Sequence, residues 1–527
     1  MVIRQFFVQV AGHRQAHRLC CAFSALALLL AGCSDRTAEA YAEAQVAQSL
    51  LNQGDIAGAR EAIARALKLR EDQVEILLLD SQIKLAAGDL RGTYDSLRMI
   101  LALDPRQPDA LLGVAQLGLT FGDTRRSVEA AETLLETDPT LAEALLVLGI
   151  HALNRKNYAQ AEALGERILT THPEDRRGVV LKARALALTD RRDEAMALLD
   201  EAAERLGNDE LSATATLENA RDAGDVAVML EQMILLRQVR PDSLDLAIDE
   251  ANIRYKSGDI EGARGVGAGI LDRFGNDADA TRRLARLWRE YDDNPLSPQT
   301  LESIASSGAI NARVAAARHY LARGEPRIAG ALVIDARDVR AIAVAARAAV
   351  ALKEPGAIAL SARVLGQDRT SCDALLAAAQ WNLEAGQPDE AIKPAQLAAT
   401  ECTDMSDGYL LTARAYLAQQ RPAGARRVYR EGLSAHPDDP VLARTYARWL
   451  LSTGQRDAAQ TVANRLTERA PAGISSWRVL AEICRATGNA SCLAEARRGE
   501  EAARGNYAID LAPGERVRNP LLGREWR

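Results

Sequence analysis

The sequence predicts an all-α protein built as a solenoid of about fourteen helix-turn-helix units, because a set of turn residues returns every 34 residues. A series of helix-ending residues keeps the same step. The turn dipeptides are Gly54-Asp55, Gly88-Asp89, Gly122-Asp123, Lys156-Asn157, Asp190-Arg191, Gly224-Asp225 and Gly258-Asp259. The second series is Pro105, Pro139, Pro173, Gly207 and Pro241. Repetition lengthens such a chain without requiring the three or four domains expected of 527 residues.

Each element of a unit follows from its local sequence. The first helix ends at the Gly-Asp turn, since Gly adopts the left-handed conformation and Asp caps the next helix. The second helix ends near the proline, which cannot continue it. Small residues let the two helices pack closely. Seven residues before each turn they are Ala47, Ser81, Ala115, Gly149, Ala183, Ala251, Ala285, Ala317, Ala346, Ala379, Ala413, Ala447 and Ala481. Five residues after it they are Ala59, Thr93, Ser127, Ala161, Ala195, Ala263, Ala329, Ala391, Ala425 and Ala459.

This period and layout resemble the tetratricopeptide repeat (TPR), although Leu217, Met229 and Leu493 depart from its small positions. The resemblance implies antiparallel helix pairs stacked into a right-handed superhelix and held by nearest-neighbour packing. We expect a regular array over residues 38–275, shortened and degenerate units over residues 276–370, and a second regular array over residues 371–505. Within the shortened units the turns are expected near Asp292, Gly324 and Lys353. The last array contains the turns Gly386, Gln420, Gly454 and Gly488.

Residues 1–32 have the form of a secretory signal. Three arginines and no acidic residue precede an apolar run from Leu19 to Leu30, which is too short for a stable membrane span. The run ends in Leu30-Ala31-Gly32-Cys33, which resembles a bacterial lipoprotein box and implies that Cys33 is lipidated; a plain signal peptide is the alternative. Residues 33–37 would then be a short tether. Ser34 is not the Asp that retains lipoproteins in the inner membrane, so the resemblance implies an outer-membrane anchor facing the periplasm.

Charge and motifs exclude several classes of function. Removal of the signal arginines lowers the formal net charge from −7 to −10, which argues against general nucleic-acid binding. We find no phosphate-binding, dinucleotide-binding, HExxH or GxSxG motif. The mature chain has four histidines, His151, His172, His319 and His436, none of which pairs with a candidate nucleophile. The sequence therefore predicts no enzyme, no cofactor and no metal site.

Four cysteines remain after the signal and Cys33 are set aside, and in the repeat frame they form two pairs. Cys372 begins the first helix of one unit, and Cys402 ends its second helix. Cys484 and Cys492 flank the Gly488 turn. An exported protein meets an oxidising compartment, so we expect disulfides Cys372–Cys402 and Cys484–Cys492; four unpaired thiols are the alternative.

An Ala-Arg dipeptide recurs at the small position of the first helix, and TPR proteins generally turn the residue after this small residue toward the concave groove. The six arginines are Arg184, Arg286, Arg318, Arg347, Arg414 and Arg448. Guanidinium groups along a groove suit carboxylates or phosphates, so the candidate ligand is an acidic or extended protein segment or an acidic polysaccharide. The alternative is that each arginine pairs with an acidic residue of a neighbouring helix.

The predicted function is a lipid-anchored periplasmic scaffold for protein–protein interactions in cell-envelope assembly. TPR lipoproteins of this kind resemble accessory components of exopolysaccharide synthesis and export, which is our first choice by analogy of fold. A pilus or secretion-system assembly lipoprotein is the alternative, and a periplasmic enzyme with a TPR substrate-binding arm is a third class. Residues 506–527 break the helical pattern at Pro513-Gly514 and Asn519-Pro520, and we expect them to form a cap or a tail.

Overall fold

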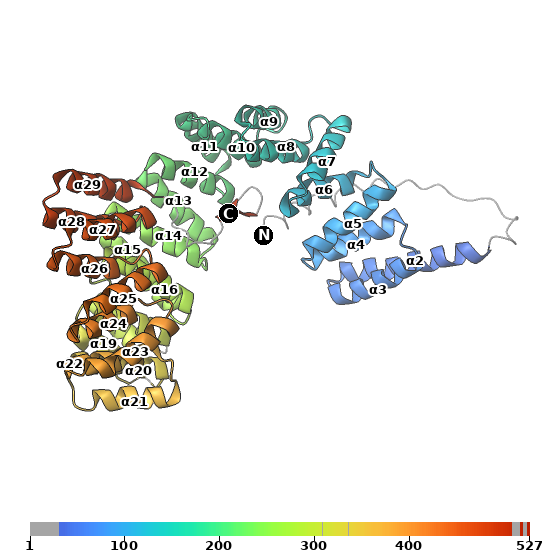
Figure 1. The fold of residues 1–527 in the computed structure, drawn as a ribbon. Helices are drawn as coiled ribbons and strands as arrows, with labels where there is room; N and C mark the ends of the chain where they lie inside the picture. The colour runs from blue at the N-terminus through green and yellow to red at the C-terminus, as the bar shows by residue number, and fades with distance from the viewer. Residues whose placement is uncertain (1–30, 308, 336, 508–516, 520–523, 527) are drawn as a thin grey trace. The chain divides into compact units, whose positions relative to one another are not determined.

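The computed structural model describes residues 31–307, 309–335, 337–507, 517–519 and 524–526. Within these ranges it contains 28 helices, α2 to α29, which follow one another as fourteen pairs (Figure 1). The first helices of the pairs are α2 (Ala31–Asn52), α4 (Val74–Ala86), α6 (Pro108–Phe121), α8 (Ala142–Asn154), α10 (Arg176–Ala187), α12 (Glu210–Ala223), α14 (Leu244–Ser257), α16 (Ala278–Tyr291), α18 (Ile310–Ala322), α20 (Val339–Ala351), α22 (Cys372–Glu384), α24 (Asp407–Ala418), α26 (Pro440–Ser452) and α28 (Ile474–Thr487).

The second helices are α3 (Ile56–Leu69), α5 (Leu90–Leu103), α7 (Thr124–Thr137), α9 (Tyr158–Thr171), α11 (Arg192–Leu206), α13 (Val226–Val239), α15 (Ile260–Phe274), α17 (Pro298–Ser306), α19 (Pro326–Val333), α21 (Ala357–Gln367), α23 (Pro388–Glu401), α25 (Pro422–Ala435), α27 (Arg456–Arg469) and α29 (Ala490–Gly505). The chain forms two compact units. The N-terminal unit runs to Asn219 and includes the C-terminal strands, and the C-terminal unit begins at Ala220.

The turns confirm the predicted 34-residue register. Thirteen of the fourteen predicted turn residues have a positive φ, and the exception is Asp292, which is extended. Four of these thirteen carry a side chain, which is unfavourable in the left-handed region. They are Lys156, Asp190, Lys353 and Gln420. Their recurrence at one register position shows that the turn geometry outweighs the local preference of these residues.

The predicted small positions form the contact between the helices of a pair. Ala47, Ala115 and Ala183 in the first helices are fully buried, as are Ala59 and Ala161 in the second helices. The buried apolar side chains form successive clusters along each unit rather than one central core. Stability therefore comes from packing between neighbouring helices, as expected of a solenoid.

The shortened spacing between residues 276 and 370 affects only the second helices. Helices α17, α19 and α21 have 9, 8 and 11 residues. The first helices of the same pairs, α16, α18 and α20, have 14, 13 and 13 residues. Pro298 and Pro326 occupy the first turns of α17 and α19, where proline is tolerated. The row of first helices therefore continues without interruption, and α18 packs directly on α20.

The C-terminal unit curves far enough for its early helices to contact its last ones, as α14 contacts α29. Lys256 of α14 donates a hydrogen bond to the carbonyl oxygen of Asn506, at the C-terminal end of α29, over 2.6 Å. Glu290 of α16 accepts one from the backbone N–H of Ser475, in the first turn of α28, over 2.7 Å. The ammonium thus lies at the negative end of a helix and the carboxylate at the positive end of another, which favours both contacts.

The two ends of the described chain differ from the prediction. Helix α2 begins at Ala31, so residues 33–37, expected to be a short tether, are helical. The strands β1 (Val517–Asn519) and β2 (Arg524–Trp526) pair in antiparallel register, which the sequence did not indicate. The predicted signal peptide lies outside the described residues apart from its last two, and the Cys33 side chain is not described. In the described part of the chain, no helix is long and apolar enough to cross a membrane.

Candidate binding surfaces

Two of the six predicted arginines, Arg318 and Arg347, contact the same buried carboxylate. Asp373, at the start of α22, has a side chain only 2% exposed. Arg318 of α18 approaches one carboxylate oxygen to 2.7 Å, and Arg347 of α20 approaches the other to 2.9 Å. Arg347 also lies 2.9 Å from Asp407 at the start of α24. These four side chains therefore connect four consecutive first helices of the C-terminal unit.

Electrostatics in this cluster keep Asp373 and Arg347 charged. Burial by itself raises the pKa of Asp373, but the charges of Arg318 and Arg347 outweigh burial and hold that pKa below its ordinary value. Burial likewise lowers the pKa of Arg347, and Asp407 and Asp373 more than compensate, so that it is raised. A buried carboxylate shared by two guanidinium groups connects successive helix pairs and is not a free anion site.

The other predicted arginines differ in access. Arg184 and Arg448 contact Glu218 and Glu482 respectively, each over 2.5 Å. In both pairs the partner lies 34 residues later, at the same position of the next unit. Arg184 is largely buried, whereas the Arg448 side chain is 62% exposed.

Arg286 and Arg414 complete the set of six. The Arg286 side chain is 60% exposed and reaches Asp438, between α25 and α26, at 3.5 Å. Arg414 is exposed and makes no ion pair within the described residues. Arg286, Arg414 and Arg448 are thus accessible, and the remaining three are engaged in packing between helices.

The structure brings the four cysteines together in the two predicted pairs. Cys372 begins α22 and Cys402 follows the last residue of α23, with their Cα atoms 5.8 Å apart in a disulfide. Cys484 and Cys492, in α28 and α29, are bridged across the Gly488 turn with a Cα separation of 5.6 Å. Both separations lie in the ordinary range for disulfides.

The described residues contain no cluster of three or more His, Cys, Asp or Glu side chains arranged to hold a metal ion. His319 is buried between Trp288 and Tyr320, and its Nε2 lies 3.1 Å from the carbonyl oxygen of Asp293. Burial lowers the pKa of this histidine. His319 therefore contributes to the packing of α16 and α18.

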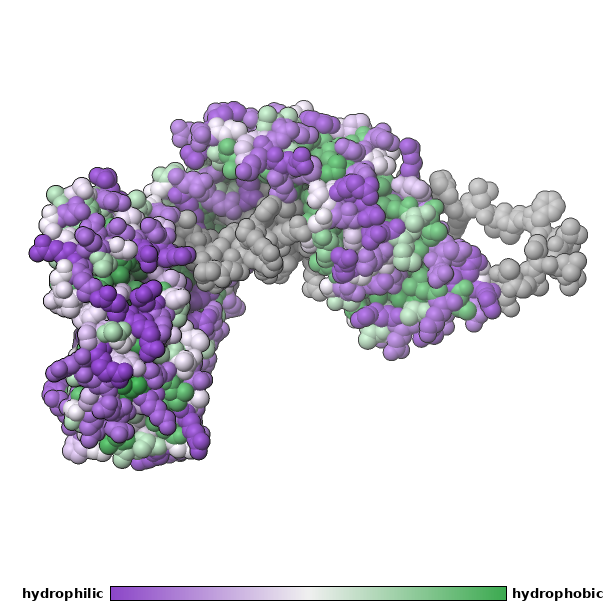
Figure 2. Space-filling model, in the orientation of Figure 1, coloured by the Kyte–Doolittle hydropathy of each residue, from purple (hydrophilic) through white to green (hydrophobic). Residues whose placement is uncertain are grey.

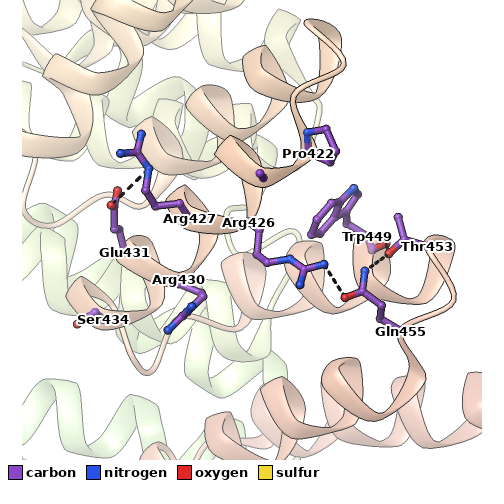
Figure 3. Close-up of a pocket in the computed structure, with 10 residues that line it drawn as sticks. Pro422, Arg426, Arg427, Arg430, Glu431, Ser434, Trp449, Thr453 and Gln455 are labelled. Atoms are coloured by element: carbon purple, nitrogen blue, oxygen red, sulfur yellow. Dashed lines mark hydrogen bonds and ion pairs between the residues drawn. The ribbon is translucent and has the colours of Figure 1, made fainter.

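A pocket of about 930 Å³ lies on the surface of α25 (Figure 3). Its lining includes Arg426, Arg427 and Arg430 of α25 and Trp449 near the end of α26. Arg426 donates a hydrogen bond to Gln455 over 2.6 Å, whereas Arg430 makes no ion pair or hydrogen bond within the described part of the chain. Arg427 pairs with Glu431 over 3.8 Å, so two of the three guanidinium groups, those of Arg426 and Arg430, lack an acidic partner within the described residues.

Two stretches of the chain match family descriptions of the tetratricopeptide repeat, residues 115–176 and residues 416–483. Each stretch begins in a first helix and contains at least one of the positive-φ turns described above. The fold is a TPR solenoid. No curated protein sequence matches this chain.

Solved structures with the same fold match parts of the chain. A TPR protein from Parabacteroides merdae is 18% identical and has a TM-score of 0.39, over 48% of this chain and 98% of its own. PilW, a type IV pilus biogenesis factor, is 20% identical with a TM-score of 0.34, over 39% of this chain and 95% of its own. Pseudomonas aeruginosa PilF is 17% identical with a TM-score of 0.32, over 40% of this chain and 96% of its own.

The position of the pocket within the repeat explains why the sequence did not predict it. The predicted arginines occupy the position after the small residue of the first helices, whereas Arg426, Arg427 and Arg430 lie on a second helix. Helix α25 contains these three arginines and one acidic residue, Glu431. A count of charge per helix does not single out α25, because α10 contains four basic residues and no acidic one.

Proposed function

We propose that this chain is a lipid-anchored TPR scaffold that faces the periplasm and binds protein partners during assembly of the cell envelope. The observation that carries the proposal is the sequence Leu30-Ala31-Gly32-Cys33 at the start of an array of fourteen helix pairs. A lipid on Cys33 would hold this array at a membrane surface. Stacked helix pairs provide an extended surface for a partner, which is the usual use of solenoids.

The proposed partner presents an acidic, extended protein segment to the accessible arginines of the first helices. Arg286, Arg414 and Arg448 are exposed, and guanidinium forks suit carboxylates. The ion pairs of Arg286 with Asp438 and of Arg448 with Glu482 compete only weakly with a bound partner, because exposed ion pairs contribute about 0–1 kcal/mol. The visible face of the molecule is mainly hydrophilic (Figure 2), which favours a polar partner over a large apolar one.

Lipidation is tested by labelling cells with a fatty-acid probe. The wild-type protein should be labelled and membrane-bound, whereas Cys33→Ala should be unlabelled and released from membranes. Cys20→Ala is the matched control, because this cysteine lies in the same segment but outside the lipoprotein box. Labelling that survives Cys33→Ala contradicts the anchor.

Partner binding is tested by cross-linking in intact cells followed by capture of the protein. Replacement of Arg286, Arg414 and Arg448 by Gln should reduce capture of the partner with little change in the melting temperature. A control triple variant removes the same charge from exposed positions of second helices, at Arg363, Arg465 and Arg497. If the triple variant of Arg286, Arg414 and Arg448 folds and captures its partner as the wild type does, these arginines do not form the binding surface.

The pathway is proposed to be exopolysaccharide synthesis or export, with pilus or secretion-system assembly as the alternative. Deletion of the gene should abolish secreted polysaccharide, and the wild-type gene should restore it. Loss of pili with normal polysaccharide would support the alternative. Genes neighbouring this one should encode the same system that the deletion impairs.

A further inference from the structure

We propose that the pocket on α25 is a binding site for an acidic oligosaccharide, in which arginines bind the sugar carboxylates and Trp449 supports a sugar ring. This site lies on a second helix and is separate from the arginines of the first helices. The inference does not depend on the protein-binding function. A chain that failed to capture a protein partner would still be expected to bind such a sugar.

The local charge is the first argument. The whole chain has a formal net charge of −7, but residues 414–456 contain eight arginines and three acidic residues. Five of these arginines make no ion pair within the described residues; they are Arg414, Arg421, Arg426, Arg430 and Arg456. Elsewhere in the C-terminal unit, arginines such as Arg264 and Arg347 bind buried carboxylates. The segment around α25 therefore has positive charge that the fold does not neutralise.

The geometry of α25 directs this charge into one pocket. Arg426 and Arg430 are one helical turn apart, whereas Arg427 points toward Glu431 and away from Arg426 (Figure 3). Residues four apart on a helix lie on the same face, about 6 Å apart along the axis. Each guanidinium offers a planar fork of donors for one carboxylate. Successive forks along a helix suit a ligand that carries carboxylates in succession.

Trp449 provides an aromatic wall that is fixed in place. Its ring stacks on Tyr446 at 6.0 Å with an interplanar angle of 17°, and lies 5.9 Å from Tyr429. The Arg426 guanidinium lies 5.8 Å from the Trp449 ring centre. Aromatic side chains that are held by their neighbours present flat apolar area without loss of conformational entropy on binding. Such a surface fits the C–H face of a sugar ring.

The remaining polar groups of the pocket are compatible with a sugar. Glu431 pairs with Arg427 over 3.8 Å, and Gln455 accepts a hydrogen bond from Arg426 and donates one to Thr453. Sugar hydroxyls both donate and accept hydrogen bonds, so they extend this polar network around the guanidinium groups. The flat face of Trp449 favours a sugar ring over a phosphate, which has no apolar face.

The test is calorimetric titration of the full-length protein in detergent with hexagalacturonate as the probe. Maltohexaose is the neutral control and hexaglutamate is the acidic peptide control. We expect binding of hexagalacturonate only. Arg430→Gln should weaken it at least tenfold, whereas Arg465→Gln, which removes an exposed charge from the next second helix, should leave it within twofold.

Trp449 gives a second measurement. Trp449→Leu should weaken binding at least tenfold, and Trp449→Phe, which keeps a flat ring, should retain most of it. If Trp449→Leu does not fold, Arg430→Gln and Trp449→Phe still decide the question. Equal or tighter binding of hexaglutamate would assign the pocket to an acidic peptide instead. Absence of hexagalacturonate binding, or equal weakening by Arg465→Gln, would overturn the proposal.

Discussion

Two groups of arginines in the C-terminal unit differ in how their charge is neutralised. Arg318 and Arg347 share the buried carboxylate of Asp373, and the Arg347 side chain is only 14% exposed. Arg426 and Arg430 of α25 are exposed and have no acidic partner within the described residues. The first group connects consecutive first helices, whereas the second group lines a pocket on one second helix.

Repeat position alone therefore does not assign a role to an arginine. The residue following the small position is structural at Arg347 and accessible at Arg448, although both occupy the same place in the repeat. What distinguishes them is the residue opposite. A buried acidic partner makes an arginine part of the fold, and the absence of one leaves its charge available to a ligand.

The largest expected effect is that of Asp373→Asn, which leaves Arg318 and Arg347 without their shared charge. Breaking a buried ion pair from one side costs about 3–5 kcal/mol, so the free energy of unfolding should fall by that amount in urea titration. Asp438→Asn is the matched control, because Asp438 pairs with an exposed arginine and its loss should cost less than about 1 kcal/mol. Equal effects of the two variants would contradict the comparison.

The same carboxylate predicts acid sensitivity. The folded-state pKa of Asp373 is lower than the ordinary value, so the stability it contributes is fully present above the unfolded-state pKa of about 3.9. That contribution is lost as the pH falls from there through the folded-state pKa. The difference in unfolding free energy between wild type and Asp373→Asn should therefore be constant at neutral pH and diminish below about pH 4.

The next largest loss of stability is expected on removal of the Cys372–Cys402 disulfide, since Cys372 directly precedes Asp373. Replacing Cys372 and Cys402 together by Ala should lower stability by roughly 3–4 kcal/mol in the chain-entropy model, and loss of Cys484–Cys492 should cost roughly 2–3 kcal/mol because its loop is shorter. Peptide mapping without reductant should first find both bridges in protein recovered from an oxidising compartment. Complete alkylation of all four thiols without reductant would contradict both. A coupling between the Cys372–Cys402 and Asp373 variants would show that the bridge positions this carboxylate.

The sequence predicted the fold well because its signals are local and repeated. Gly54, Gly88 and Gly122 mark turns with a positive φ at intervals of 34 residues. Lys353 is identified as a turn residue of the same kind once the register is known. The cysteine pairs followed from the same register, since antiparallel helices place the ends Cys372 and Cys402 together. Local sequence also indicated shortened units, although not that only second helices are short.

The binding surfaces were less predictable, because they depend on which side chains face each other across units. Nothing near Arg347 in the sequence indicates that Asp373 and Asp407, 26 and 60 residues later, neutralise it. Contacts made by superhelical curvature are even more distant, such as Glu290 with Ser475, 185 residues later. A repeat register gives the position of a residue within its unit, but not its partner in another unit.

A smaller loss of stability is expected on removal of Glu290, whose charge lies at the N-terminal end of α28. Glu290 accepts hydrogen bonds from the backbone N–H and the hydroxyl of Ser475, and so caps α28, whose own N-cap residue is Gly473. Glu290→Ala should lower stability by about 1 kcal/mol, the usual loss for a helix cap. Hydrogen exchange should increase mainly in the first turn of α28. Unchanged exchange there would show that this contact does not hold the curvature of the C-terminal unit.

The smallest effect, and opposite in sign, is expected at Arg430. Arg426 and Arg430 are like charges four residues apart on α25, an arrangement that destabilises a helix by about 0.2–0.5 kcal/mol. Arg430→Gln should therefore raise the free energy of unfolding by about that amount, with the gain shrinking at high salt because exposed charges are screened. Arg347→Gln, the same substitution in the buried group, should instead lower it, since Asp373 and Asp407 lose a partner. A decrease of 1 kcal/mol or more for Arg430→Gln would place this arginine with the structural group. A gain in stability that accompanies a loss of sugar binding would mean that α25 tolerates unneutralised charge for the sake of its ligand, which is the stability–function exchange expected of a binding site.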